Sequence, residues 1–236
     1  MAKKKRRRQP RPLRVTTSLR ESWGVALEVE SVVQSVSVPP AQPSTSSEPE
    51  PGPGGGYWGL LLPPGCPRRA LLLGLGGGTV AHLLARRCPD VAMVGVERDA
   101  NVLAVARAQF GLDTLPTLTI VEADAFEWAR DLAVADDERF DLICIDLFEA
   151  GRLAPGALGT TFLRQIAGLL APEGTLTINL MVTGRTPEQL HRLRRVFRIV
   201  RELRLRGNLV VHAQSGPTES EVRDEDSGGA GAAQLP

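Results

Sequence analysis

Short apolar segments alternate with amphipathic segments along most of the chain, from residue 70 to residue 213. Five of the apolar segments have the length and the composition of strands that are buried within a parallel sheet. These predicted strands lie at residues 70–73, 91–96, 118–121, 140–145 and 175–180. Predicted helices lie at residues 79–87, 101–110, 125–132, 162–170 and 186–196, and two closing strands at 199–205 and 209–213. The alternation predicts an α/β fold with a Rossmann-like, doubly wound and mostly parallel sheet.

Composition divides the chain into five segments. The first 14 residues hold eight Lys and Arg and no acid, whereas valines and serines alternate shortly afterwards, as in a strand. A stretch rich in Pro, Ser, Glu and Gly follows, and the chain ends in Gly, Ala, Ser and acidic residues. We therefore expect a basic disordered head at 1–20, a small N-terminal β-hairpin at 21–38, a Pro/Ser/Gly-rich linker at 39–56, a Rossmann-like domain at 57–214 and an acidic disordered tail at 215–236.

The basic head has two interpretations. Such a run of positive charge can contact nucleic acid or, in a eukaryote, act as a nuclear signal. It can equally be a solvated tail without a specific partner.

Hydropathy and cysteine content indicate in which compartment the protein is expected. No apolar run approaches the roughly 20 residues that span a bilayer, and the N-terminus lacks the apolar core of a signal peptide. Cys66, Cys88 and Cys144 are odd in number and match no metal or redox spacing. We therefore expect reduced cysteines, no metal and a cytoplasmic location.

A glycine-rich turn follows the first predicted strand of the main sheet. Gly74, Gly76 and Gly78 lie between this strand and a helix, where glycine lets the backbone turn and approach a ligand closely. Glu97 ends the next strand, at the place where nucleoside-binding folds hold the ribose hydroxyls. The turn alone could be structural, but the two features together predict a site for a nucleoside cofactor.

Acidic residues follow three successive predicted strands. Glu97 ends the second strand, Asp124 follows the third, and Asp146 ends the fourth, with Glu149 in the loop behind it. The carboxyl ends of parallel strands meet at one edge of the sheet, which is where ligands bind in this architecture. These four side chains are therefore expected to share one site.

Four motifs follow one another along the chain, at residues 71–78 (LLLGLGGG), 95–99 (GVERD), 122–125 (EADA) and 140–146 (FDLICID). In this order they resemble the spermidine synthase-like branch of the class I S-adenosylmethionine-dependent methyltransferases. Residues 31–35, with Gln34, look like the N-terminal strand of that branch, whose glutamine faces the cofactor. The resemblance covers about residues 27–213.

The resemblance implies a role for each candidate residue. The three glycines would pass beneath the methionine part of S-adenosylmethionine or of its decarboxylated form. Glu97 would accept both ribose hydroxyls, and Asp124 the adenine amino group, with the Ala125 amide nearby. Asp146 would position or deprotonate the acceptor group, and Glu149 would stand in for a second acid of the polyamine synthases. A homodimer and a small acceptor molecule, such as an amine, are also implied.

Two departures from the family's pattern leave two reactions possible, methyl transfer and aminopropyl transfer. Polyamine synthases carry an acid at the position of Gly77, whereas common methyltransferases carry one at the position of Leu72. The tyrosine that follows the N-terminal strand of the synthases is missing there, and Tyr57 comes after the linker instead. We expect a spermidine synthase-like methyltransferase, with aminopropyl transfer as the second hypothesis. A third is a non-catalytic module that binds a nucleoside or nucleic acid.

Overall fold

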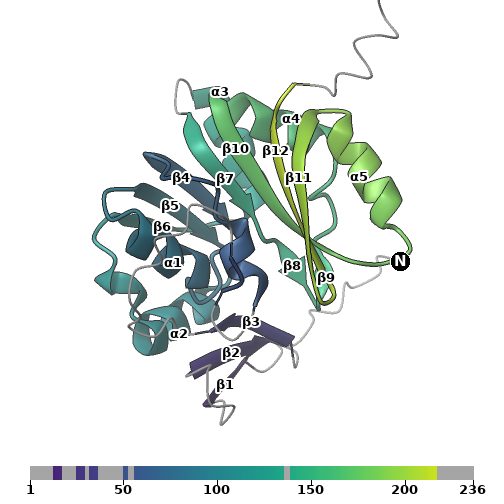
Figure 1. Cartoon of the computed structure of the whole chain (residues 1–236). Helices are drawn as coiled ribbons and strands as arrows, with labels where there is room; N and C mark the ends of the chain where they lie inside the picture. Colours follow the sequence, from purple (N-terminus) through teal and green to yellow (C-terminus); the bar gives the residue numbers. More distant parts are fainter. Residues whose placement is uncertain are drawn as a thin grey trace, which may run out of the picture.

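A seven-stranded sheet with the strand order β11-β12-β10-β7-β4-β5-β6 lies at the centre of the protein (Figure 1). The computed structural model describes residues 13–17, 25–29, 32–36, 50–52, 56–135 and 139–216. The strands are β4 (Arg69–Leu73), β5 (Ala92–Glu97), β6 (Leu118–Glu122), β7 (Phe140–Ile145), β10 (Leu170–Met181), β11 (Phe197–Leu205) and β12 (Asn208–Ser215). The first five are parallel, and β12 runs antiparallel to both of its neighbours. The predicted doubly wound, mostly parallel sheet is confirmed.

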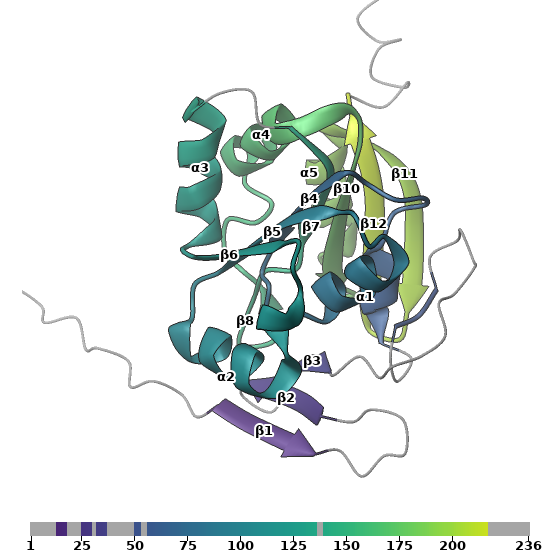
Figure 2. The same cartoon turned by 90° about the vertical axis from the view of Figure 1, so that its left-hand side faces the viewer.

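Helices cover both faces of this sheet, as Figure 2 shows. They are α1 (Thr79–Arg87), α2 (Ala100–Phe110), α3 (Ala125–Ala135), α4 (Thr160–Leu169) and α5 (Thr186–Arg194). Successive residues of a strand point to opposite faces, so Leu71 and Leu73 of β4 pack with α3, α4 and α5. Ala70 and Leu72 pack on the other side, with α1 and α2. Both faces of β4 are buried, which explains why its sequence is apolar throughout.

The N-terminal strands form a separate antiparallel sheet. It contains β1 (Leu13–Thr17), β2 (Val25–Val29) and β3 (Val32–Val36), in this order. The expectation of a disordered head up to residue 20 is therefore wrong for β1, because the adjacent run of basic residues hid the strand. Leu27 of β2 is fully buried against Val102 and Phe110 of α2 and fixes this sheet to the main domain.

Several short elements were not expected. A 3₁₀ helix, η2 (Tyr57–Leu61), precedes β4, and another, η3 (Leu112–Thr114), follows α2. Behind β7, a hairpin of β8 (Phe148–Glu149) and β9 (Arg152–Leu153) replaces the expected loop. Strand β10 begins earlier than predicted, with a register shift against β7. These details depend on tertiary contacts more than on local pattern.

Cys66 and Cys88 form a disulfide, so the expectation of three reduced cysteines is wrong for this pair. β4 and α1 run in opposite directions, so Cys66, just before the strand, lies close to Cys88, just after the helix. Cys144 is free and buried, and burial raises the pKa of its thiol. The argument from reduced cysteines to a cytoplasmic location loses its basis.

Replacing Cys66 and Cys88 by serine is expected to lower the free energy of unfolding by about 3 kcal/mol. The disulfide closes a loop with a sequence separation of 22 residues, and its loss enlarges the unfolded ensemble. Urea denaturation of the wild type and the double variant measures the difference. A reductant should bring the wild type to the midpoint of the variant and leave the variant unchanged. Equal midpoints without reductant would contradict the prediction.

None of the helices in the described ranges is long and apolar enough to cross a membrane.

Candidate active site

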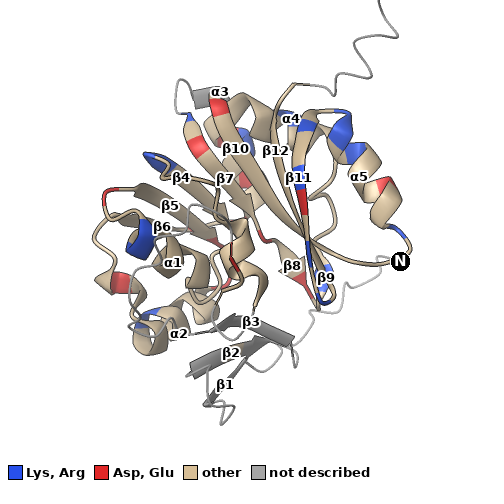
Figure 3. Cartoon of the chain, viewed as in Figure 1, with Lys and Arg blue, Asp and Glu red and all other residues tan. Residues whose placement is uncertain are grey.

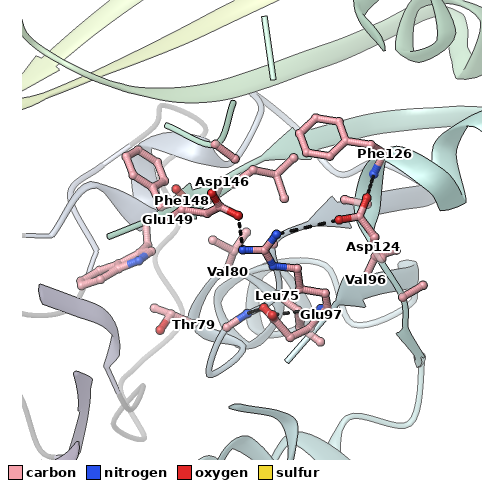
Figure 4. Close-up of a pocket in the computed structure, with 18 residues that line it drawn as sticks. Leu75, Thr79, Val80, Val96, Glu97, Asp124, Phe126, Asp146, Phe148 and Glu149 are labelled. Carbon is pink, nitrogen blue, oxygen red and sulfur yellow. Dashed lines mark hydrogen bonds and ion pairs between the residues drawn. The ribbon is translucent and has the colours of Figure 1, made fainter. Parts of the chain in front are cut away.

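A pocket opens where the chain leaves the carboxyl ends of β4, β5, β6 and β7 (Figure 4). It contains about 700 Å³ of space, open mouth included. Of the residues expected at the site, it is lined by Gly74, Gly76, Glu97, Asp124, Ala125, Asp146 and Glu149. The expected gathering of the four acids at one edge of the sheet is therefore found.

One of the expected residues, Gly78, is not part of the pocket lining. Gly78 begins α1 and does not line the pocket, and a Cβ at this position would overlap Leu112. Its conformation, with φ of 83°, belongs to the left-handed region that glycine adopts without strain. Gln34 lies on β3, and its side chain is outside the described part of the chain.

The glycine turn brings β4 against the end of β7. Gly74 has φ of 88°, and a Cβ there would overlap the carbonyl oxygen of Asp146. The amides of Gly74 and Leu75 both donate to the carbonyl oxygen of Val96, at 3.0 and 3.1 Å. Only glycine permits this approach together with this backbone conformation.

Glu97 braces the glycine turn from the end of β5. One carboxylate oxygen, Oε2, accepts the Gly76 amide at 2.9 Å. The other, Oε1, accepts the amides of Arg98 and Asp99 at 3.0 and 3.1 Å. The carboxylate is thus held in one orientation at the pocket wall.

Asp124 caps α3 with one oxygen and leaves the other toward the pocket. Its Oδ1 accepts the amides of Phe126 and Glu127, at 2.9 and 3.2 Å. These bonds satisfy N–H groups that a helix start leaves without partners. Oδ2 lies 3.9 Å from Nη1 of Arg98.

Arg98 was not singled out from the sequence, yet it spans the pocket. Its Nη2 pairs with Oε1 of Glu149, while Nη1 faces Asp124, and Figure 4 marks both interactions with dashed lines. Glu149 is therefore already paired with a cation. The position of Arg98, directly after Glu97, was the available signal.

Asp146 is held by two side chains from distant parts of the chain. Tyr57 Oη donates to its Oδ2 at 2.9 Å, and Asn179 Nδ2 donates to its Oδ1 at 3.0 Å. Burial raises the pKa of Asp146 to about 6, although both hydrogen bonds act in the opposite direction. This carboxylate can therefore exchange a proton near neutral pH.

The partners of Asp146 were missed by the sequence analysis. Tyr57 was discounted because it follows the linker, but η2 brings its hydroxyl to Asp146. Burial raises the pKa of Tyr57 well above its usual value, and the charge of Asp146 adds to this effect. Asn179 is a buried polar residue in an apolar strand next to β7, which was a usable signal.

No group of His, Cys, Asp and Glu residues within the described ranges has a geometry that could hold a metal ion.

Comparisons with known proteins agree with this architecture. Residues 70–174 match a family described as "Methyltransferase domain". The polyamine aminopropyltransferase of Chromobacterium violaceum is 30% identical over 122 residues, which cover 51% of this chain and 45% of that protein. The human eEF1A lysine and N-terminal methyltransferase is 26% identical over 165 residues, covering 65% of this chain and 24% of that protein. This chain thus spans less than half the length of either curated relative.

A solved structure extends the similarity. Human methyltransferase-like protein 13, in complex with SAH, has a TM-score of 0.59 and 25% identity, covering 68% of this chain and 79% of that one. These matches and the strand order show a domain similar to those of the class I S-adenosylmethionine-dependent methyltransferases, and residues 70–174 match a methyltransferase domain.

Proposed function

We propose that this protein is an S-adenosylmethionine-dependent transferase that moves a methyl group to an amine-bearing acceptor. The main support is Asp146, whose raised pKa and two hydrogen bonds place a proton acceptor in the same pocket as the glycine turn. The reaction class follows from the domain family and this arrangement together.

The residues of the pocket fit an adenosine group. Adenosine presents hydroxyl and amino donors, and the pocket offers two oriented carboxylates, Glu97 and Asp124. Glu97 is fixed by backbone amides in a position to accept the ribose hydroxyls. Oδ2 of Asp124, with no amide bound to it, would accept the adenine amino group beside Ala125. The glycine turn provides a surface without side chains for the methionine part.

The bound cofactor would supply a sulfonium carbon that is open to attack. Asp146 would then accept the proton that an acceptor amine loses as it becomes a nucleophile. Tyr57 and Asn179 would keep the Asp146 carboxylate in place. The alignment of the acceptor amine with the sulfonium carbon would then supply most of the rate enhancement. Leu147 and Phe148 line the pocket beside Asp146 and would contact an apolar part of the acceptor.

Aminopropyl transfer is the second candidate function. The relative named polyamine aminopropyltransferase favours it, whereas the relative named as a lysine and N-terminal methyltransferase favours methyl transfer. A diamine needs several acids to hold two ammonium groups. Glu149 is paired with Arg98, which leaves Asp146 as the acid at the acceptor end that no cation neutralises in the described structure.

The partners beyond a small acceptor remain predictions. A homodimer and nucleic-acid contact through the basic head are proposed from the sequence, and the first 12 residues lie outside the described part. A cytoplasmic location also stays a prediction, now without the support of reduced cysteines. Basic residues also gather on α5 and β11 (Figure 3). Two of them are paired with acids, Arg192 with Glu188 at 2.6 Å and Arg194 with Glu202 at 2.9 Å. This pairing reduces the charge available to a phosphate backbone.

Calorimetric titration with S-adenosylmethionine tests the proposal directly. We expect the wild type to bind, and Glu97→Gln to bind about 10- to 100-fold more weakly, since hydrogen bonds to a charged acceptor contribute about 1.5–3 kcal/mol.

Glu122→Gln is the matched control. Glu122 lies beside Glu97 on β6, is exposed and does not line the pocket. Its replacement should leave the affinity unchanged. If neither S-adenosylmethionine nor its decarboxylated form binds the wild type, the proposed function is wrong.

A further inference from the structure

Buried polar residues gather on the face of the main sheet that η2 covers. Among the described residues, the buried polar side chains are those of Thr79, Thr177, Asn179, Thr186 and His212. Thr177 and Asn179 lie two positions apart on β10, and His212 of β12 is directly opposite Thr177, so all three share one face. η2 contacts both strands. Burial of a polar side chain is unfavourable unless a hydrogen bond compensates it, so the partner of His212 indicates what this residue does.

His212 donates a hydrogen bond to the last turn of η2. Its Nε2 lies 2.7 Å from the carbonyl oxygen of Leu60, and its side chain is 3% exposed. A carbonyl oxygen can only accept, so Nε2 carries the proton. Burial lowers the pKa of His212, although the bond to Leu60 acts in the opposite direction, and the charge of Arg201 lowers it further. The imidazole is therefore uncharged at neutral pH, with its one proton directed at η2.

The same short helix carries a donor to Asp146. Tyr57 is the first residue of η2, and its Oη donates to Oδ2 of Asp146 at 2.9 Å. Tyr57 and Leu60 are three positions apart, which is one turn of a 3₁₀ helix, so they lie on the same side of η2. A rotation or a slide of η2 at Leu60 therefore moves the Tyr57 hydroxyl as well.

The packing of η2 on the domain is largely apolar. Trp58 packs against α1, and Leu61 is fully buried. Apolar burial holds η2 on the domain, but it is non-directional and constrains the rotation of the helix only weakly. A hydrogen bond constrains it more, because the bond weakens steeply when donor and acceptor are misaligned. The bond from His212 to Leu60 supplies this directional contact at the C-terminal end of η2.

We propose that His212 is a positioning residue of the active site, whose bond to Leu60 orients η2 so that Tyr57 donates to Asp146. The inference rests on the proposed function for its effect on turnover, and it gives β12, which follows the region that matches the methyltransferase family, a part in that function. His212 does not line the pocket and acts through Tyr57. Burial raises the pKa of Asp146 and the Tyr57 bond lowers it, so loss of His212 should raise this pKa further.

A ¹³C NMR titration of the Asp146 carboxyl group tests the inference without cofactor or reaction. His212→Leu keeps an apolar side chain and removes the donor, and we expect its titration midpoint to lie above that of the wild type. Tyr57 and Cys144, the titratable groups beside Asp146, stay uncharged in this range, because burial raises the pKa of both. With an active acceptor, kcat/KM at neutral pH should fall about three- to tenfold, which corresponds to the loss of one hydrogen bond.

Two variants distinguish positioning from a general loss of packing. His212→Gln should titrate like the wild type, because its side-chain amide can donate from the place of Nε2. Val211→Ala is the matched control, since Val211 precedes His212 on β12, is fully buried and packs on the opposite face of the sheet. It should lower the Tm and leave the titration unchanged. An equal rise in Val211→Ala, or no rise in His212→Leu, would overturn the inference.

Tyr57→Phe identifies the route of the effect. This variant lacks the hydroxyl that donates to Asp146, so its midpoint should also lie above that of the wild type. Addition of His212→Leu should then raise the midpoint no further, because both changes remove the same interaction. Additive effects of the two substitutions would contradict a route through Tyr57.

The wild type provides a measurement that does not depend on a variant's folding. A ¹⁵N spectrum of the His212 ring should show an uncharged imidazole with its proton on Nε2 throughout the range in which Asp146 titrates. A proton on Nδ1 or a charged ring would overturn the inference. If the wild type binds neither form of the cofactor, the proposed function is wrong, and the titrations still decide whether His212 orients the donor to Asp146.

Discussion

Asp146→Asn is expected to lower turnover by about 10²- to 10⁴-fold while the protein remains folded. An amide cannot accept the proton of the acceptor amine, yet it has nearly the same size and can still accept a hydrogen bond from Tyr57. Release of S-adenosylhomocysteine or methylthioadenosine, with putrescine, spermidine and a set of primary amines as acceptors, measures the loss. Circular dichroism and the Tm check the fold.

The pH dependence of kcat/KM tests the role of Asp146 as a base in a second way. Burial raises the pKa of Asp146 to about 6, so the base becomes ionised as the pH rises through that value. Wild-type kcat/KM should therefore rise with pH and level off above about 6. For stability the sign is opposite, because a raised carboxyl pKa means that the folded state binds the proton more tightly than the unfolded state. The contribution of Asp146 to stability improves as the pH falls from about 6 toward its ordinary value of 3.8.

Asp141→Asn is a control on the same strand. Asp141 accepts the amides of Arg68 and Arg69 near the start of β7 and does not line the pocket. Its replacement should leave the turnover and its pH profile essentially unchanged. An Asp146→Asn protein with wild-type turnover would remove Asp146 from the mechanism.

Gly74→Ala is expected to lower the free energy of unfolding by about 2–5 kcal/mol. Left-handed backbone costs a non-glycine residue about 1–2 kcal/mol, and overpacking adds about 1–3 kcal/mol. Here the new methyl group would overlap the carbonyl oxygen of Asp146, which is backbone and cannot rotate away. Urea denaturation measures the loss, and any S-adenosylmethionine binding that remains should be weaker, because the turn and Asp146 must move apart.

Gly65→Ala separates the two causes. Gly65 has a similar φ of 80°, but a Cβ there would meet nothing within 4 Å. This variant should therefore lose only about 1–2 kcal/mol, the backbone cost. If both variants lose the same amount, the contact between Gly74 and Asp146 is not what requires glycine.

The features that the sequence predicted well depend on local pattern. The apolar run of β4, the glycines after it and the acids that follow successive strands are each readable within a few residues. The parallel arrangement then brings Glu97, Asp124 and Asp146 to one edge, because all parallel strands end there.

The features that the sequence did not predict depend on contacts between distant residues. Tyr57 and Asp146 are separated by 89 positions, and nothing near either residue indicates their hydrogen bond. The disulfide was missed because an odd number of cysteines without a motif suggested thiols, although a cysteine before β4 and one after α1 could have indicated it. The direction of the Arg98 side chain depends on Glu149 and Asp124, which become neighbours only in the folded chain.

The 3₁₀ helix η2 and strand β10 contribute residues around Asp146 from outside the region that matches the methyltransferase family. The region that matches the methyltransferase family is residues 70–174, but Tyr57 and Trp58 lie before it and Asn179 lies after it. A fragment trimmed to the matched region would keep the glycine turn and the four acids, yet Asp146 would lose both hydrogen-bond donors. Under the proposed function, the smallest active piece of this protein would therefore be larger than the region that matches the family. A transplant of residues 70–174 alone would carry the pocket without the two side chains that hold Asp146.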